Sequence, residues 1–86
     1  MYIVIITIDS WHLANDIHQP TLDTYISNNL DVCLDKAFSR WDDLKDNKGN
    51  PIDKDYIHSK LGNKEYLNVE VIRPREGWIR IEYIGE

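Results

Sequence analysis

The sequence contains a single cysteine, Cys33, which excludes a disulfide within the chain and the cysteine framework of small secreted proteins. It contains only four glycines, all scattered, so no glycine-rich loop is present to hold a phosphate group. Basic residues are also few: 10 Lys and Arg stand against 15 Asp and Glu, and no three basic residues are adjacent. Because nucleic-acid-binding proteins usually present a basic stripe, the sequence disfavours a nucleic-acid partner. The single cysteine favours a cytoplasmic protein, because disulfide-stabilised domains are typical of oxidising compartments.

Chain length and charge limit the classes of protein that remain. With 86 residues, 42% of them hydrophobic, the chain suffices for one domain spanning 1–86 and is too apolar for a disordered protein. The net charge of -5 lies in the first half, because residues 1–46 hold eight Asp and three basic residues, whereas residues 47–86 hold seven acidic and seven basic residues. An acidic half predicts a protein partner with a basic surface, because complementary charge speeds encounter and selects partners.

The first apolar run, Tyr2 to Ile8, predicts a β-strand because β-branched residues dominate it. Apolar side chains fall on both of its faces, a pattern typical of a strand that is covered on both sides. The run is too short to cross a membrane. We expect it at an edge of the sheet, although it has no proline or charge to protect an edge. It then pairs with a second copy in a homodimer or with another chain, or residues 11–19 cover it.

The segment from Thr21 to Asp46 predicts the main helix, with Thr21 as its N-cap after a proline. Apolar residues recur every three or four positions and form one stripe, which is Leu22, Ile26, Leu30, Cys33, Ala37, Trp41 and Leu44. The opposite side carries a row of carboxylates, Asp31, Asp35, Asp42 and Asp46, with Asp43 nearby. The Asn28-Asn29 pair is a weak helical sequence, at which the helix can break or kink.

The rest of the chain predicts a short helix and a β-hairpin. Asp53 is the expected N-cap of a helix that ends near Leu61, before a glycine. Residues 65–73 and 78–85 alternate apolar and polar side chains and predict two paired strands. The predicted fold is therefore α+β: a three-stranded, mainly antiparallel sheet in the order β-α-α-β-β, with one long amphipathic helix packed on one face.

The hairpin connection predicts the register of its two strands. A three-residue loop at 75–77, containing a glycine, pairs Val71 with Ile81 and places the apolar rows of both strands on one face. The other face then carries Trp78 and Arg80.

A search for catalytic or metal-binding patterns finds none that is specific. Asp9, His12, Asp16 and His18 could gather after the first strand around a divalent ion, but ordinary polar loop residues are the favoured interpretation. The acidic loop around Gly49 lacks the ligands of a calcium-binding EF-hand. The sequence therefore predicts no enzyme activity, no cofactor and no metal.

We expect a small acidic interaction protein, most consistent with an inhibitor. The class includes a phage or mobile-element protein of the anti-CRISPR type, which blocks a host nucleic-acid-processing or defence complex, and an immunity protein that neutralises a basic nuclease. The candidate partner-binding residues lie on the acidic helix face and the outer hairpin face, and they are Asp31, Asp35, Asp42, Asp43, Asp46, Tyr66, Ile72, Trp78 and Arg80. The alternative is a domain that binds single-stranded nucleic acid by stacking bases on the hairpin aromatics, with arginines on phosphates.

Overall fold

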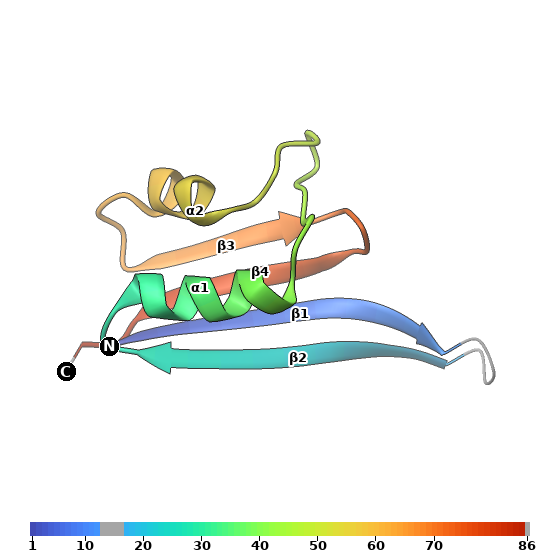
Figure 1. The fold of residues 1–86 in the computed structure, drawn as a ribbon, viewed down its shortest axis with the longest axis horizontal. Coiled ribbons are helices and arrows are strands. Elements are labelled where there is room, and N and C mark those ends of the chain that lie inside the picture. Colours follow the sequence, from blue (N-terminus) through green and yellow to red (C-terminus); the bar gives the residue numbers. More distant parts are fainter. Residues whose placement is uncertain (13–16, 86) are drawn as a thin grey trace.

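A computed structural model describes residues 1–12 and 17–85 of the chain, and the side chains of residues 1–8 and 22–85. Its elements follow in the order β1 (Tyr2–His12), β2 (Ile17–Ser27), α1 (Leu30–Arg40), α2 (Lys54–Leu61), β3 (Tyr66–Val71) and β4 (Gly77–Tyr83). Figure 1 shows α1 lying over the sheet and α2 beside β3. The prediction of an α+β fold with an antiparallel sheet is confirmed, but the sheet has four strands and not three.

The sheet has the strand order β2-β1-β4-β3, and every neighbouring pair is antiparallel. The expected edge position of the first strand is therefore wrong: β1 pairs with β2 on one side and with β4 on the other. Its cover comes from β2 and not from a loop at 11–19. Because both edges of the segment 2–8 are occupied within the chain, this segment offers no free edge to a second copy.

The largest correction concerns the start of the predicted helix. Leu22 and Ile26 lie on β2 and are exposed, and the helix begins only at Leu30. A spacing of four places two residues on one face of a helix, but because four is even it also places them on one face of a strand. Threonine, tyrosine and isoleucine between positions 21 and 26 favour the strand.

The N-cap of α1 is Asn29, in the Asn28-Asn29 pair, whose helix propensity is low. The side chain of Asn29 accepts a 2.9 Å hydrogen bond from the backbone N–H of Asp31, as an N-cap asparagine does. The helix ends at Arg40, so residues 41–46 belong to the following loop. The predicted single helical row from Asp31 to Asp46 is thus wrong, because the helix covers only its first half.

The prediction for the second helix is confirmed. The Asp53 carboxylate accepts a 2.9 Å hydrogen bond from the Tyr56 backbone N–H, and Gly62 follows Leu61 with a positive φ of 52°. Both helices bury apolar side chains, Cys33 among them, against one face of the sheet, while Val32 of α1 stays exposed. The sheet residues of this core are Val4, Ile6, Ile8, Val69, Val71, Ile79 and Ile81.

The predicted hairpin register is wrong, although the predicted face is right. Val71 pairs with Gly77 and Val69 pairs with Ile79, so the connection is longer than three residues. The reason is Lys45 in the loop after α1. Its carbonyl accepts from the backbone N–H groups of Ile72 and Arg73, which draws these residues away from β4.

The opposite face of the sheet is called here the open face. No described helix or loop covers it, and among the residues whose side chains are described the register places three of each strand on it. They are Ile3, Ile5 and Thr7 on β1, Leu22, Thr24 and Ile26 on β2, Tyr66, Asn68 and Glu70 on β3, and Trp78, Arg80 and Glu82 on β4. Neither helix is long and apolar enough to cross a membrane, among the described residues.

Candidate functional site

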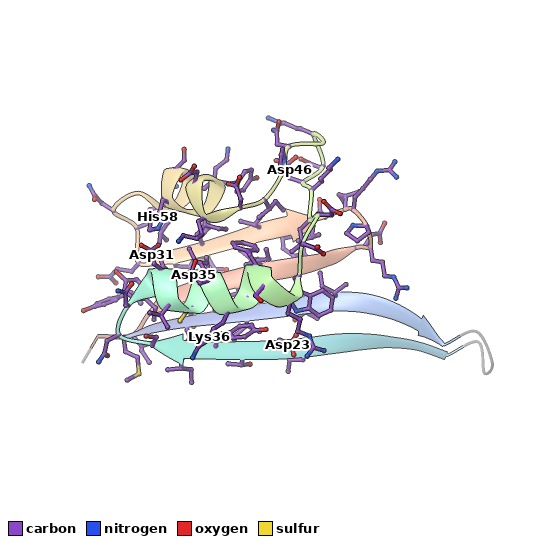
Figure 2. The ribbon with its side chains drawn as sticks, viewed as in Figure 1. Asp23, Asp31, Asp35, Lys36, Asp46 and His58 are labelled. Atoms are coloured by element: carbon purple, nitrogen blue, oxygen red, sulfur yellow. The ribbon has the colours of Figure 1, made fainter. Side chains whose placement is uncertain are left out.

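The first two carboxylates of the predicted acidic face lie on α1 and point toward α2. Asp31 Oδ1 lies 2.6 Å from His58 Nε2, and Asp35 Oδ1 lies 2.8 Å from Lys54 Nζ (Figure 2). The hydrogen bond from His58 holds the pKa of Asp31 below its ordinary value. Both pairs join the two helices at the surface, so half of the predicted row already has partners within the chain.

Asp46 is only 7% exposed and serves the loop between the helices. Its Oδ1 accepts from the backbone N–H groups of Lys48 and Asn50, each at 2.9 Å, and its Oδ2 accepts from the Tyr56 hydroxyl at 2.8 Å. Burial alone raises the pKa of this carboxyl, but the hydrogen bonds from Asn50, Tyr56 and Lys48 outweigh burial and lower the pKa. We therefore assign Asp46 to the architecture of the loop.

Asp42 and Asp43 remain exposed after the end of α1, and they border an apolar cleft of about 260 Å³. We call it the acidic cleft. Its walls come from the end of α1, from the loop and from the start of α2, and they are Phe38, Trp41, Asp42, Asp43, Leu44, Lys45, Pro51, Ile52 and Asp53. The cleft thus combines apolar walls with three carboxylates and one ammonium group.

The electric field of the acidic cleft favours a cation. Asp42 and Asp43 follow the C-terminus of α1, where unpaired carbonyl groups add partial negative charge. Asp43 has a positive φ of 57°, a conformation that aspartate and asparagine tolerate better than most residues. Among the described residues, no ion pair joins Asp42, Asp43 or Asp53 to a base. Lys45 offsets one of the three charges.

The cleft is attached to the sheet and to the hairpin by specific bonds. Trp41 Nε1 donates a 2.6 Å hydrogen bond to Asp23 on β2, and the Arg40 guanidinium lies 5.5 Å from the indole ring centre. Leu44 and Ile52 are joined by a 2.8 Å backbone hydrogen bond at the floor, and Lys45 N–H donates to the Arg73 carbonyl. These bonds fix the walls of the cleft relative to the sheet and the hairpin.

The predicted residues of the hairpin divide into two groups. Tyr66, Trp78 and Arg80 lie on the open face, where the Arg80 guanidinium is 5.0 Å from the Tyr66 ring centre and is paired with Glu82 at 3.0 Å. Ile72 follows the end of β3 and lines a small hollow beside Trp78. The structure therefore brings the hairpin residues and the acidic residues to different sides of the sheet.

A second hollow of about 350 Å³ lies at the other end of the helices and contains His58 and Asp31. A histidine–carboxylate pair can act as a base when a nucleophile stands beside it. The described residues that line the hollow include no serine, threonine or cysteine. What the structure shows is that the pair bridges α1 and α2 at 2.6 Å.

The candidate metal residues Asp9, His12, Asp16 and His18 lie outside the described side chains. Among the described residues, no group of three metal-ligating side chains gathers. Comparisons with protein-family models, with curated proteins and with solved structures found no match to this chain.

The sequence did not identify Phe38, Trp41 and Asp53 as parts of one site. It placed Trp41 on a buried helical stripe and gave Asp53 only a capping role. The sequence feature that could have indicated the site is the end of the helix near Asp42. The residues that follow a helix end lie in a loop and can contact residues of other elements.

Proposed function

We propose that this protein is a non-enzymatic interaction protein of the cytoplasm that binds a basic protein through the acidic cleft and thereby inhibits it. A single observation carries the proposal: Asp42, Asp43 and Asp53 surround a cleft with apolar walls at the C-terminal end of α1. Apolar walls with a charged rim fit an amphipathic cation, and they distinguish this site from an ordinary solvated acidic surface.

The occupant that matches this chemistry is an arginine or lysine side chain of the partner. Its aliphatic stem packs against Phe38 and Trp41, and its charged head reaches the rim carboxylates. Arginine fits better than lysine, because a guanidinium binds carboxylates through paired hydrogen bonds and stacks on aromatic rings. Such a side chain is common on surfaces that hold nucleic acid.

The inhibitor role follows from charge and size. An acidic chain of 86 residues that occupies a basic groove competes with the nucleic acid for which the groove is built. This supports a phage or mobile-element inhibitor of a host nucleic-acid-processing or defence complex, and equally an immunity protein against a basic nuclease.

The first test titrates the protein with a short capped peptide that holds one arginine between alanines. We expect backbone NMR shifts confined to residues 38–45 and 51–53, and none with the same peptide carrying neutral citrulline. The double variant Asp42→Asn/Asp43→Asn should weaken binding about tenfold, a loss that corresponds to about 1.4 kcal/mol. The control Asp55→Asn/Glu65→Gln removes the same charge from exposed positions outside the cleft and should bind like the wild type. Equal weakening by both variants would show that only net charge matters.

The second test concerns the partner itself. The wild type, the Asp42→Asn/Asp43→Asn variant and the Asp55→Asn/Glu65→Gln variant serve as baits in a lysate from a candidate host. We expect a basic protein that is retained by the wild type and the control and is lost from the cleft variant. The same retained proteins on all three baits would contradict the proposal.

A second candidate function is favoured by one observation, the Arg80 guanidinium over the Tyr66 ring beside Trp78 on the open face. Single-stranded nucleic acid stacks its bases on such aromatic side chains. Glu70 and Glu82 on the same face oppose phosphate binding. A salt-dependent gel shift with single-stranded RNA or DNA would support this candidate, and the absence of a shift at low salt would remove it.

A further inference from the structure

The segment 2–8 of β1 carries apolar side chains on both faces, but the described helices and loops cover only one of them. Val4, Ile6 and Ile8 are buried beneath the helices, whereas Ile3 and Ile5 lie half-buried on the open face. Antiparallel sheets with one solvated face normally alternate apolar and polar residues. An apolar second face on a central strand indicates a cover from outside the described part of the chain.

The sheet register gathers further apolar side chains around these two isoleucines. Ile26 lies opposite Ile3, while Leu22 and Trp78 lie on either side of Thr7. Leu22 is 64% exposed, Ile26 is 58% exposed and Trp78 is 46% exposed. They are large side chains on β2 and β4, the two strands that flank β1, and they share one surface with Ile3 and Ile5. Exposed apolar patches of this kind mark interaction sites.

The charge distribution favours a second copy of this chain as the occupant. Among the described side chains of the open face, one is basic and two are acidic, Arg80, Glu82 and Glu70, and the first two are paired at 3.0 Å. The described part of this face is therefore nearly neutral in a chain with a net charge of -5. The exposed carboxylates Asp42 and Asp43 belong to the opposite, helical side. Two copies can pack through their open faces while these acidic sides point away from each other.

We propose that the open face, centred on Ile3, Ile5, Leu22, Ile26 and Trp78, is the interface of a homodimer in which two sheets pack face to face. Sheets that pack in this way bury interdigitated apolar side chains between them. The inference does not rest on the proposed binding of a basic partner, because it involves the other side of the sheet.

The size of the face sets the strength of the dimer. Strands about 4.8 Å apart with a rise of about 3.4 Å per residue give roughly 450 Å² per copy, or about 900 Å² in total. Stable complexes bury more, about 1,200–2,000 Å². We therefore expect a reversible dimer that dissociates on dilution, and not an obligate one.

The test measures mass by sedimentation equilibrium from low micromolar to near-millimolar concentration. We expect the mass to rise from 10.2 kDa toward twice that value. Ile26→Lys should keep the protein monomeric throughout, and because Ile26 is exposed in the monomer the fold should be retained. Val32→Lys is the matched control, since it removes an exposed apolar residue of α1 and adds the same charge; it should dimerise like the wild type.

A second measurement locates the contact. The chain has three tryptophans, so fluorotryptophan labelling gives three fluorine NMR signals, and the variants Trp78→Phe and Trp41→Phe each assign one of them. We expect the Trp78 signal to shift with concentration and the Trp41 signal to stay constant. A monomer at every concentration would overturn the proposal. A dimer that leaves the Trp78 signal unmoved, as edge pairing through β2 would, also overturns it. The proposal is also overturned if the Trp78 signal shifts only when single-stranded nucleic acid is added and the protein stays monomeric.

Discussion

Trp41 Nε1 donates a hydrogen bond of 2.6 Å to Asp23 Oδ2, which joins the end of α1 to the strand β2. The same oxygen forms an ion pair with Arg40, whose Nε lies 3.0 Å away. Figure 2 shows Asp23 on β2, beneath the end of α1. One carboxylate therefore fixes the direction of the loop that carries Asp42 and Asp43. The wall of the acidic cleft depends on a residue that lies in a different element and outside the cleft.

The first prediction concerns this carboxylate. Asp23→Ala should lower the free energy of unfolding by about 1–2 kcal/mol, because it removes a charge-assisted hydrogen bond to a partly buried indole. Arg40→Ala should cost less than about 0.5 kcal/mol, because the Arg40 side chain is 61% exposed and exposed ion pairs contribute little. Urea unfolding of both variants checks the ranking. Equal losses would mean that the Arg40 pair, and not the indole, holds Asp23.

The bond between Asp23 and Trp41 also shows what the sequence could not reveal. The short helix at Lys54–Leu61 and the apolar faces of the hairpin were predictable, because their caps and alternation are local. The segment around Leu22 was not, because its spacing suits a helix and a strand equally. Only the pairing of β2 with β1 decides between them, and that pairing is a tertiary interaction.

Only part of the acidic cleft could be predicted from the sequence, because its other part depends on tertiary interactions. Asp42 and Asp43 were recognised as exposed acidic residues, but as members of a helical row. The row ends because the chain turns after Trp41 and its backbone pairs at Lys45 with Arg73. Contacts between residues so distant in sequence leave no periodic signal.

The two proposals together describe one geometry. The acidic cleft lies on the helical side of the sheet and the open face lies on the other side. A face-to-face dimer therefore carries two acidic clefts on opposite outer surfaces. It would hold two copies of a partner, or two sites of one partner, with the avidity of a bivalent binder.

The second prediction concerns the packing of β4 on β1 at Gly77. A Cβ at this position would lie 2.1 Å from the Thr7 carbonyl oxygen and 2.9 Å from the Ile8 Cα. Because both are backbone atoms, the strands must separate, and Gly77→Ala should cost about 2–3 kcal/mol. Gly49→Ala has open space around the new Cβ and should cost about 1 kcal/mol, through its positive φ of 81° alone. Thermal unfolding of both variants compares the two costs. An equal loss of stability in both would contradict the close approach of Gly77 to the β1 backbone.

The third prediction concerns stability in acid. Hydrogen bonds hold the pKa of Asp46 below its ordinary value of 3.8 despite burial. A carboxyl with a lowered pKa in the folded state stabilises the fold above the unfolded pKa, and this contribution is lost as the pH falls through the folded pKa. The urea midpoint of the wild type should therefore fall more steeply below about pH 4 than that of Asp46→Asn. Asp55→Asn, which removes an exposed carboxylate of α2, should follow the wild type. If the urea midpoints of all three proteins fell in parallel with pH, the hydrogen bonds of the loop would not lower the pKa of Asp46.

The fourth prediction concerns stability in alkali, at the other end of the same hydrogen bond. Burial, followed by the hydrogen bond to Asp46, raises the pKa of Tyr56 to about 12. A group with a raised pKa of this kind stabilises the fold below its unfolded pKa, here 10.0, and the contribution is lost as the pH rises toward about 12. In an ultraviolet titration of the five tyrosines, Tyr56 should ionise last.

Two variants separate the causes of this raised pKa. Tyr56→Phe should remove the last step of the titration and flatten the alkaline loss of stability. Asp46→Asn should move the step toward lower pH but not to the ordinary value, because burial of the ring remains. If Asp46→Asn left the step unchanged, burial alone would account for the raised pKa of Tyr56. The hydrogen bond between Tyr56 and Asp46 would then not attach the loop, which carries one wall of the acidic cleft, to α2.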